Sequence, residues 1–252
     1  MKSSRSKLDA IITSIGSVLI GKEAEVRVAL ACLLARGHLL VEDLPGMGKT
    51  TLANAMARVL GLDFVRIQFT SDLLPADIVG VSVYDRNEAT FRFHRGPVFC
   101  QLLLADEINR TTPKTQSALL EAMAEGQVTV EGQTHELPEP FFVIATQNPV
   151  HLSGTFPLPE SQLDRFLMRL SLGYPDLASE KSILTGGDPR ARLAELEPQV
   201  TLPELLALQE EVDQVSVAEP VIDYLQRLIQ FTRSSEVFEY GLSPRAALAI
   251  LQ

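Results

Sequence analysis

An eight-residue stretch, Asp43-Leu-Pro-Gly-Met-Gly-Lys-Thr50, constrains the fold of this chain more than any other segment. It follows a short apolar run, residues 38–42, which predicts a strand. It precedes residues 49–60, whose apolar side chains recur at helical spacing. A glycine-rich turn between a strand and a helix, ending in Lys and Thr, is typical of a phosphate-binding P-loop. The stretch therefore predicts the α/β fold of a P-loop NTPase.

Each residue type in this loop has a chemical reason. Gly46 and Gly48 allow backbone N–H groups to turn toward phosphate oxygens, and the N-terminus of the following helix adds positive partial charge. We expect Lys49 to reach the β- and γ-phosphates of ATP, and the Thr50 hydroxyl to hold Mg²⁺. Asp43 stands where the strict motif has glycine. The predicted nucleotide-binding residues of the loop are Asp43, Leu44, Pro45, Gly46, Met47, Gly48, Lys49, Thr50 and Thr51.

Two later apolar runs end in polar side chains. Leu102-Leu-Leu-Ala-Asp-Glu107 ends in two acids. We expect Asp106 to hold Mg²⁺ through its water shell, and Glu107 to orient and deprotonate the attacking water. Phe141-Phe-Val-Ile-Ala-Thr-Gln-Asn148 ends in an amide. Because parallel strands share one carboxyl edge, Asn148 is expected near the γ-phosphate, where it helps to position that water. Together these motifs predict ATP hydrolysis.

Strand-like and helix-like segments alternate through the first two-thirds of the chain. The predicted strands include residues 64–69, 98–105 and 141–146, and the predicted helices include 23–36 and 113–125. This alternation predicts a parallel sheet flanked by helices over residues 1–174. Two hairpin-like stretches, about 81–95 and 127–137, interrupt it as inserts. Residues 175–252 have helical patterns, including 178–185, 203–212 and 220–232, and predict a smaller all-helical domain.

Composition narrows the setting. The 252 residues include 22 basic and 32 acidic side chains, a formal net charge of −10. An acidic surface repels phosphate backbones, so nucleic-acid binding is disfavoured. No apolar run approaches the roughly 18 residues of a membrane span, and residues 8–20 have the pattern of an amphipathic helix rather than a signal peptide. Cys32 and Cys100 lie in apolar runs and predict buried thiols, so we expect a cytoplasmic protein without membrane insertion.

Beyond these motifs, the sequence resembles the MoxR family of AAA+ ATPases along nearly its whole length. The stretches that carry the resemblance are Arg66-Ile-Gln-Phe-Thr-Ser-Asp-Leu-Leu-Pro75, Gly96-Pro-Val-Phe99, Ala105-Asp-Glu-Ile-Asn-Arg110, Pro113-Lys-Thr-Gln-Ser-Ala-Leu-Leu-Glu-Ala-Met123, Ala145-Thr-Gln-Asn-Pro149, Leu158-Pro-Glu-Ser-Gln-Leu-Asp-Arg-Phe166 and Tyr240-Gly-Leu-Ser-Pro-Arg-Ala246. The resemblance implies that the hairpins are the helix-2 insert and the pre-sensor-1 insert of this AAA+ branch. It also implies that residues 175–252 form a helical lid, which we expect to be truncated at its C-terminus.

The resemblance implies roles for further residues. Asn148 is similar to sensor 1. Arg165 is similar to the arginine finger, which reaches the ATP site of a neighbouring subunit, and Arg169 is a second candidate for that role. Arg245 is similar to sensor 2, a lid residue expected to contact the γ-phosphate of its own subunit. Ile20 and Gly21 are implied to lie beside the adenine and to contact it through their backbone.

The resemblance implies a homo-oligomeric ATPase, a hexameric ring that remodels or matures a client protein in a chaperone-like role. Partner proteins with a von Willebrand factor A domain are also implied. A chelatase-type or helicase-related motor subunit, a slow nucleotide-dependent switch and a small-molecule kinase remain alternatives. The lack of Lys and Arg in residues 127–137 weighs against a DNA motor, and Glu107 weighs against a switch. A kinase has no need of Arg165 or Arg245.

Overall fold

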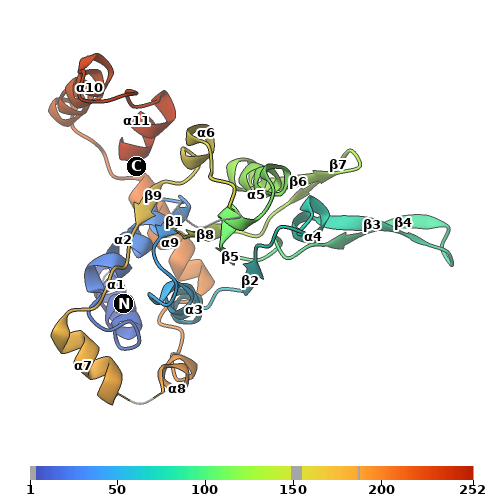
Figure 1. Cartoon of the computed structure of the whole chain (residues 1–252), viewed down its shortest axis with the longest axis horizontal. Helices are drawn as coiled ribbons and strands as arrows, with labels where there is room; N and C mark the ends of the chain where they lie inside the picture. Colours follow the sequence, from blue (N-terminus) through green and yellow to red (C-terminus); the bar gives the residue numbers. More distant parts are fainter. Residues whose placement is uncertain (1–3, 149–154, 187, 252) are drawn as a thin grey trace.

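The computed structural model of the chain describes residues 4–148, 155–186 and 188–251. Its centre is a five-stranded sheet in the order β2-β5-β8-β1-β9 (Figure 1). The strands are β1 (Leu39–Glu42), β2 (Phe64–Gln68), β5 (Leu102–Asp106), β8 (Phe142–Gln147) and β9 (Met168–Leu170). All neighbouring pairs are parallel, which confirms the predicted parallel sheet. The carboxyl ends of the strands therefore share one edge, and their amino ends share the other.

Alternate residues of the buried strands face two cores, one on each side of the sheet. On β5, Leu102 and Leu104 belong to a core shared with α1, α2 and α3, whereas Leu103 and Ala105 belong to a core shared with α5. These helices are α1 (Ser4–Gly16), α2 (Glu23–Leu34), α3 (Lys49–Leu60) and α5 (Pro113–Glu125). Every residue of β5 and β8 is buried, as expected for strands covered on both faces.

The predicted strand at residues 98–105 is wrong in its first half, because strand pairing begins only at Leu102. Residues 98–101 form a buried turn. The amide of Cys100 donates to Val98 O at 2.9 Å, and the amide of Val98 donates to Ile78 O at 3.1 Å. Val98 and Cys100 are fully buried, so this part of the apolar run indicates burial rather than extended backbone. Cys32 and Cys100 are buried free thiols, as predicted.

Both predicted hairpins are present and extend from the same end of the molecule (right of Figure 1). They pair β3 (Gly80–Asp85) with β4 (Thr90–Arg95) and β6 (Gln127–Val130) with β7 (Gln133–Glu136). A short helix that the sequence patterns did not predict, α4 (Pro75–Val79), precedes the first hairpin. His135 of β7 stacks on Phe93 of β4 with ring centroids 4.2 Å apart, so the two hairpins contact each other.

The chain after Pro175 is helical, with α7, α9 and α10 at predicted helical segments. The helices are α7 (Leu177–Thr185), α8 (Pro189–Ala194), α9 (Leu202–Asp213), α10 (Glu219–Ser234) and α11 (Pro244–Leu251); the short elements η1 (Ile108–Arg110) and α6 (Glu160–Leu163) precede them. Leu205 and Leu208 of α9 belong to the same core as α2, and Gln209 Nε2 donates to Leu33 O at 2.7 Å. The domain boundary at residue 175 stays a prediction. α9 comes after this boundary in the sequence but packs against α2, which comes before it. Within the described ranges, no helix is long and apolar enough to cross a membrane.

A buried histidine holds the amino edge of the sheet. His38 lies directly before β1, and its Nδ1 accepts a hydrogen bond from the Val143 amide at 3.1 Å. The proton is therefore on Nε2, which lies 3.1 Å from Met123 O and donates to it. Burial lowers the pKa of His38 to about 4, although the Met123 carbonyl acts in the opposite direction. A neutral imidazole thus joins β1, β8 and α5.

Acidification should destabilise the fold through His38. The unfolded chain takes up this proton near pH 6.5 and the folded chain only near pH 4, so the stabilising contribution is complete above pH 6.5 and is lost toward pH 4. Between about pH 7 and 5, the wild type should lose about 2 kcal/mol more of its free energy of unfolding than a His38→Gln variant. Urea unfolding of both proteins at the two pH values measures this. Equal losses would contradict the assignment.

Candidate functional site

The loop between β1 and α3 adopts the predicted phosphate-binding turn. Gly46 and Gly48 have φ values of 86° and 93°, in the left-handed region that favours glycine. α3 begins at Lys49, so the backbone N–H groups of its first turn lie beside the loop. The Lys49 side chain is buried, and its Nζ donates to Asp43 O at 2.6 Å and to Asn148 Oδ1 at 3.1 Å. The amine therefore lies between the start of the loop and the end of β8.

Asp43, where the strict motif has glycine, has a structural role. Its Oδ1 accepts a hydrogen bond from the Leu44 amide at 2.8 Å. Its Oδ2 accepts from the Gly173 amide at 2.7 Å and from the Ser171 hydroxyl at 3.1 Å. Burial alone would raise the pKa of the Asp43 carboxyl, but these hydrogen bonds together hold it below its usual range. Asp43 is therefore an anion that ties the loop to the chain after β9.

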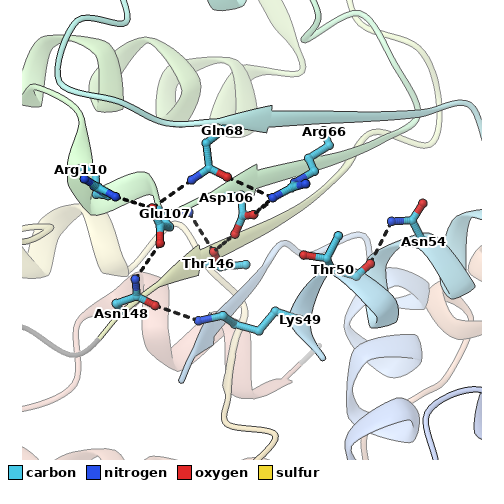
Figure 2. A network of polar contacts seen from close by, with 10 residues as sticks. All are labelled: Lys49, Thr50, Asn54, Arg66, Gln68, Asp106, Glu107, Arg110, Thr146 and Asn148. Atoms are coloured by element: carbon cyan, nitrogen blue, oxygen red, sulfur yellow. Dashed lines mark hydrogen bonds and ion pairs between the residues drawn. The ribbon is translucent and has the colours of Figure 1, made fainter. Parts of the chain in front are cut away.

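Asp106, the last residue of β5, is buried beside the loop. Its Oδ1 accepts from the Thr146 hydroxyl at 2.7 Å, and its Oδ2 accepts from Arg66 Nη2 at 2.6 Å (Figure 2). Thr146 belongs to β8 and Arg66 to β2, so the strands on both sides of β5 fix the carboxylate. The contact with Arg66 is an ion pair, which adds a charge-assisted hydrogen bond to that of Thr146. Asp106 thus offers a carboxylate in a fixed position at the carboxyl edge of the sheet.

Glu107 follows in a left-handed backbone conformation, with φ of 58°. Its Oε1 accepts from Asn148 Nδ2 at 2.9 Å. Its Oε2 accepts from Gln68 Nε2 at 2.9 Å and from Arg110 Nη1 at 3.1 Å. A strained backbone at a non-glycine residue persists only where its surroundings hold it in place. These three donors fix the carboxylate from two sides (Figure 2).

Asn148 connects the lysine and the acid. Its Oδ1 accepts from Lys49 Nζ, and its Nδ2 donates to Glu107 Oε1. Each end of the amide thus meets a partner of the complementary kind, which defines its orientation. The structure therefore brings three predicted residues, from the start of α3 and from just after β5 and β8, into one hydrogen-bonded row.

Four residues of this network were not assigned a role from the sequence: Arg66, Gln68, Arg110 and Thr146. The alternation of β2 offers a signal for two of them, because residues 66 and 68 lie on the same face of the strand. The register then pairs Gln68 with Asp106. Pairing between β2 and β5 is a long-range property, so the sequence pattern alone did not reveal the contact.

The charge of Lys49 depends on its neighbours. Burial lowers the pKa of its amine more than the carboxylates of Asp106, Asp43 and Glu107 raise it. A bound polyphosphate would add negative charge next to the same amine. Such a ligand therefore stabilises the charged lysine, and in return the lysine favours an anionic ligand.

Two cavities meet at the loop. One, of about 360 Å³, is lined by Lys49, Thr50, Asp106, Glu107 and Asn148 among others. The second, of about 510 Å³, is more apolar and is lined by residues that include Ile20, Met47, Tyr174, Ile183 and Leu184. Both cavities share Pro45, Gly46, Gly48 and Thr51. A polar cavity continuous with an apolar one fits a triphosphate and its base. Ile20 lines the apolar cavity, and its expected contact with the base stays a prediction.

The predicted neighbour of Ile20 has a second constraint. Gly21 has φ of 73°, and a Cβ atom there would lie 2.2 Å from Ser179 Oγ. Glycine is therefore required for α7 to approach the chain beside the apolar cavity. The expected backbone contact of Gly21 with the base stays a prediction, because Gly21 is absent from the residues that line this cavity.

Thr50 and Asp106 fit the role of magnesium-holding residues. Both line the polar cavity. No group of three or more potential metal ligands from His, Cys, Asp and Glu occurs among the residues with described positions. Mg²⁺ at nucleotide sites takes only one or two protein ligands and completes its shell with phosphates and water. A hydroxyl and one carboxylate are therefore the donors that a nucleotide-bound Mg²⁺ needs.

The structure places Arg165, Arg169 and Arg245 outside the lining of the polar cavity at the P-loop. Arg165 and Arg245 both line a separate cavity of about 350 Å³, which shares no residue with the polar cavity at the loop. Arg165 Nη1 donates to Leu120 O at 2.6 Å. Arg169, the other candidate, forms an ion pair with Glu42 of its own chain. Arg165 and Arg245 thus share one surface, and Arg169 is engaged in a different contact.

The expected contact of Arg245 with the γ-phosphate of its own subunit is corrected by this placement. His38 and Leu167, which line the same cavity, precede β1 and β9, so the cavity lies at the amino edge of the sheet. The P-loop lies at the carboxyl edge. Four residues of β1, about 13 Å of extended chain, separate the two edges.

Comparison with known proteins agrees with this geometry. Residues 38–168 match the model of the "ATPase family associated with various cellular activities (AAA)". The chain is 46% identical to the uncharacterized protein YeaC of Bacillus subtilis over 97% of this chain and 77% of YeaC. It is 40% identical to chaperone MoxR1 of Mycobacterium tuberculosis over 97% of this chain and 67% of MoxR1.

A solved structure agrees as well. The crystal structure of a candidate ATPase from Cytophaga hutchinsonii superposes with a TM-score of 0.86 and 37% identity, over 98% of this chain and 78% of that one. The fold, the P-loop with its acid pair and the relatives all lead to the same conclusion: the chain belongs to the MoxR family of AAA+ ATPases.

Proposed function

We propose that this chain hydrolyses ATP to ADP and phosphate with Mg²⁺, as a subunit of a ring whose ATP sites are completed by neighbouring subunits. The observation that carries the proposal is the orientation of Glu107. Its two carboxylate oxygens are held by Asn148 on one side and by Gln68 and Arg110 on the other. A carboxylate fixed next to a phosphate-binding loop is the general base that ATP hydrolysis requires.

The loop binds the phosphates. N–H groups at Gly46, Gly48 and the start of α3 surround the phosphate oxygens, and Lys49 exchanges its contacts with Asp43 O and Asn148 for contacts with phosphate. Thr50 and Asp106 would hold Mg²⁺, and the bound ion would supply positive charge that offsets the negative charge developing on the phosphates. The apolar cavity beside Ile20 and Tyr174 takes the base.

Glu107 accepts a proton from the attacking water, and Asn148 positions that water. Asn148 suits this role because it already contacts both Lys49 and Glu107. When Lys49 moves onto a phosphate, Asn148 Oδ1 becomes available to accept a hydrogen bond from the water. Glu107, with φ of 58°, lines the polar cavity beside the loop together with Lys49 and Asn148.

Arg165 and Arg245 need a neighbouring subunit in order to contact ATP. Arg165 and Arg245 lie at the amino edge of the sheet, away from the P-loop of their own chain. They can contact a γ-phosphate only if that phosphate belongs to another subunit, as in a closed homo-oligomeric ring. We infer a hexamer, in which Arg165 stabilises charge on the transferring phosphoryl group and Arg245 assists it from the same surface.

The proposed task of the ring is chaperone-like remodelling of a protein client in the cytoplasm, including clients or partners with a von Willebrand factor A domain. The relative MoxR1 is described as a chaperone. The β3–β4 hairpin exposes Phe91, Tyr84 and Val81, which favours contact with protein. The sequence of the β6–β7 hairpin contains no Lys or Arg, which weighs against a DNA motor. The acidic net charge of −10 weighs against nucleic acid in general.

Glu107→Gln should abolish turnover while ATP binding remains. An amide keeps the shape of the side chain but cannot accept the proton, so kcat should fall by a factor of at least about 100. ATP hydrolysis and ATP binding should be measured on the same preparation. Glu121→Gln, an exposed acid on α5, is the matched control and should retain wild-type turnover. Unchanged turnover in Glu107→Gln would remove the general-base assignment.

Mixing two inactive variants tests the shared site. Lys49→Ala should lose its own ATP site but still present its arginines, whereas Arg165→Ala should bind ATP but fail to assist its neighbour. Because the two defects lie on different surfaces, mixed rings contain intact sites, and the mixture should hydrolyse ATP at a substantial fraction of the wild-type rate. Native mass with and without ATP shows whether rings form. A mixture that assembles and stays inactive would contradict the proposal.

A further inference from the structure

Three arginines line the cavity at the amino edge of the sheet. Besides Arg165 and Arg245, the lining includes Arg36, and the acid among the lining residues is Asp164. Acidic residues outnumber basic ones by 32 to 22 in the whole chain, so this cavity reverses the local sign of charge. Like charges gathered in one place repel each other unless an anion joins them. Three arginines around one cavity are therefore more favourable with a bound anion than without one.

The backbone at Arg36 is strained. Arg36 follows the end of α2 with φ of 53°. The amide of Gly37 donates to Cys32 O at 2.9 Å and the amide of Arg36 donates to Leu33 O at 3.1 Å, a helix ending in which glycine usually occupies the left-handed position. Glycine is instead needed one residue later, because a Cβ on Gly37 would lie 2.3 Å from Leu167. An arginine kept in a left-handed position suggests that its side chain has a function.

The guanidinium of Arg36 is held by one ion pair and keeps N–H donors for a ligand. Its Nε donates to Asp213 Oδ2 at 3.2 Å, and this ion pair leaves the side chain 42% exposed. Among the described residues, the Arg36 guanidinium has no other hydrogen-bond partner than Asp213. The two Nη groups can therefore donate to a ligand while Asp213 fixes the orientation of the fork.

Arg165 is incompletely satisfied in the same cavity. Its Nη1 contacts Leu120 O, but its buried Nε has no hydrogen-bond partner among the described residues. A buried charged donor without a partner costs free energy until a ligand or a conformational change supplies one. Arg36 and Arg165 thus both have N–H donors without an acceptor, and a single anion between them would supply it.

We propose that Arg36 is a third arginine of the shared site and contacts the phosphates of ATP bound to a second copy of this chain. This rests on the proposed completion of each site by a neighbouring subunit. Arg36 and Arg165 precede β1 and β9, which are paired in parallel, so both lie at the amino edge. A neighbour that brings its γ-phosphate to Arg165 brings the same anion toward Arg36.

Arg36→Gly separates this role from a structural one. Glycine relieves the left-handed strain, so the melting temperature should not fall. The loss of a positioned donor should lower kcat about tenfold or more, while the KM for ATP stays near that of the wild type because the P-loop is intact. Arg36→Lys, which keeps the charge, should recover part of the activity. Arg27→Ala, an exposed arginine of α2 paired with Glu23, is the control and should retain wild-type turnover.

Mixing experiments assign the surface. Arg36→Gly mixed with Lys49→Ala should recover activity, because the Lys49→Ala subunits supply intact arginines. Arg36→Gly mixed with Arg165→Ala should recover none, because no subunit in that mixture has an intact arginine surface. If Lys49→Ala rescues Arg165→Ala but not Arg36→Gly, the shared site stands and the role of Arg36 falls. If it rescues neither, the shared site itself falls. Wild-type kcat or a lowered melting temperature in Arg36→Gly would also overturn the inference.

Discussion

Because all five strands run in the same direction, the central sheet has two chemically different edges. The carboxyl edge carries the P-loop after β1, the acid pair after β5 and Asn148 after β8. The amino edge carries His38, Arg36 and Arg165. Backbone geometry keeps these two sets apart, so no rotamer change can bring Arg165 to the P-loop of its own chain. The proposed division of one active site between two subunits is consistent with this separation of the two edges.

Hydrogen bonds within the chain orient the acids at the carboxyl edge of the sheet. Asp106 is held by Thr146 and Arg66, and Glu107 by Asn148, Gln68 and Arg110. Polar groups that are already oriented need no reorganisation during the reaction, which is how such sites lower a barrier. Lys49 differs, because burial opposes its charge and its partners are a backbone carbonyl and a neutral amide. A phosphate improves the environment of Lys49, so ligand binding and the lysine charge support each other.

Local patterns predicted the elements that carry the site. α3 and α5 begin and end at the predicted residues, since glycine or proline marks their ends. The patterns did not predict features that depend on contacts between segments distant in the sequence. Val98 and Cys100 are apolar because they are buried in a turn, and Arg66 reaches Asp106 because β2 pairs with β5. Arg245 was expected at its own P-loop, but the position of α11 depends on tertiary packing that periodicity does not report.

Asp43 shows what a departure from the motif can add. Its carboxylate accepts hydrogen bonds from Ser171 and from Gly173, and Gly173 itself lines the apolar cavity. Lys22 donates to the carbonyls of Leu172 and Tyr174 from the opposite side. A glycine at position 43 would satisfy the loop but leave the Gly173 amide without this acceptor. Asp43 and Lys22 therefore fix one connecting segment, which links the loop after β1 to α7 and to the apolar cavity.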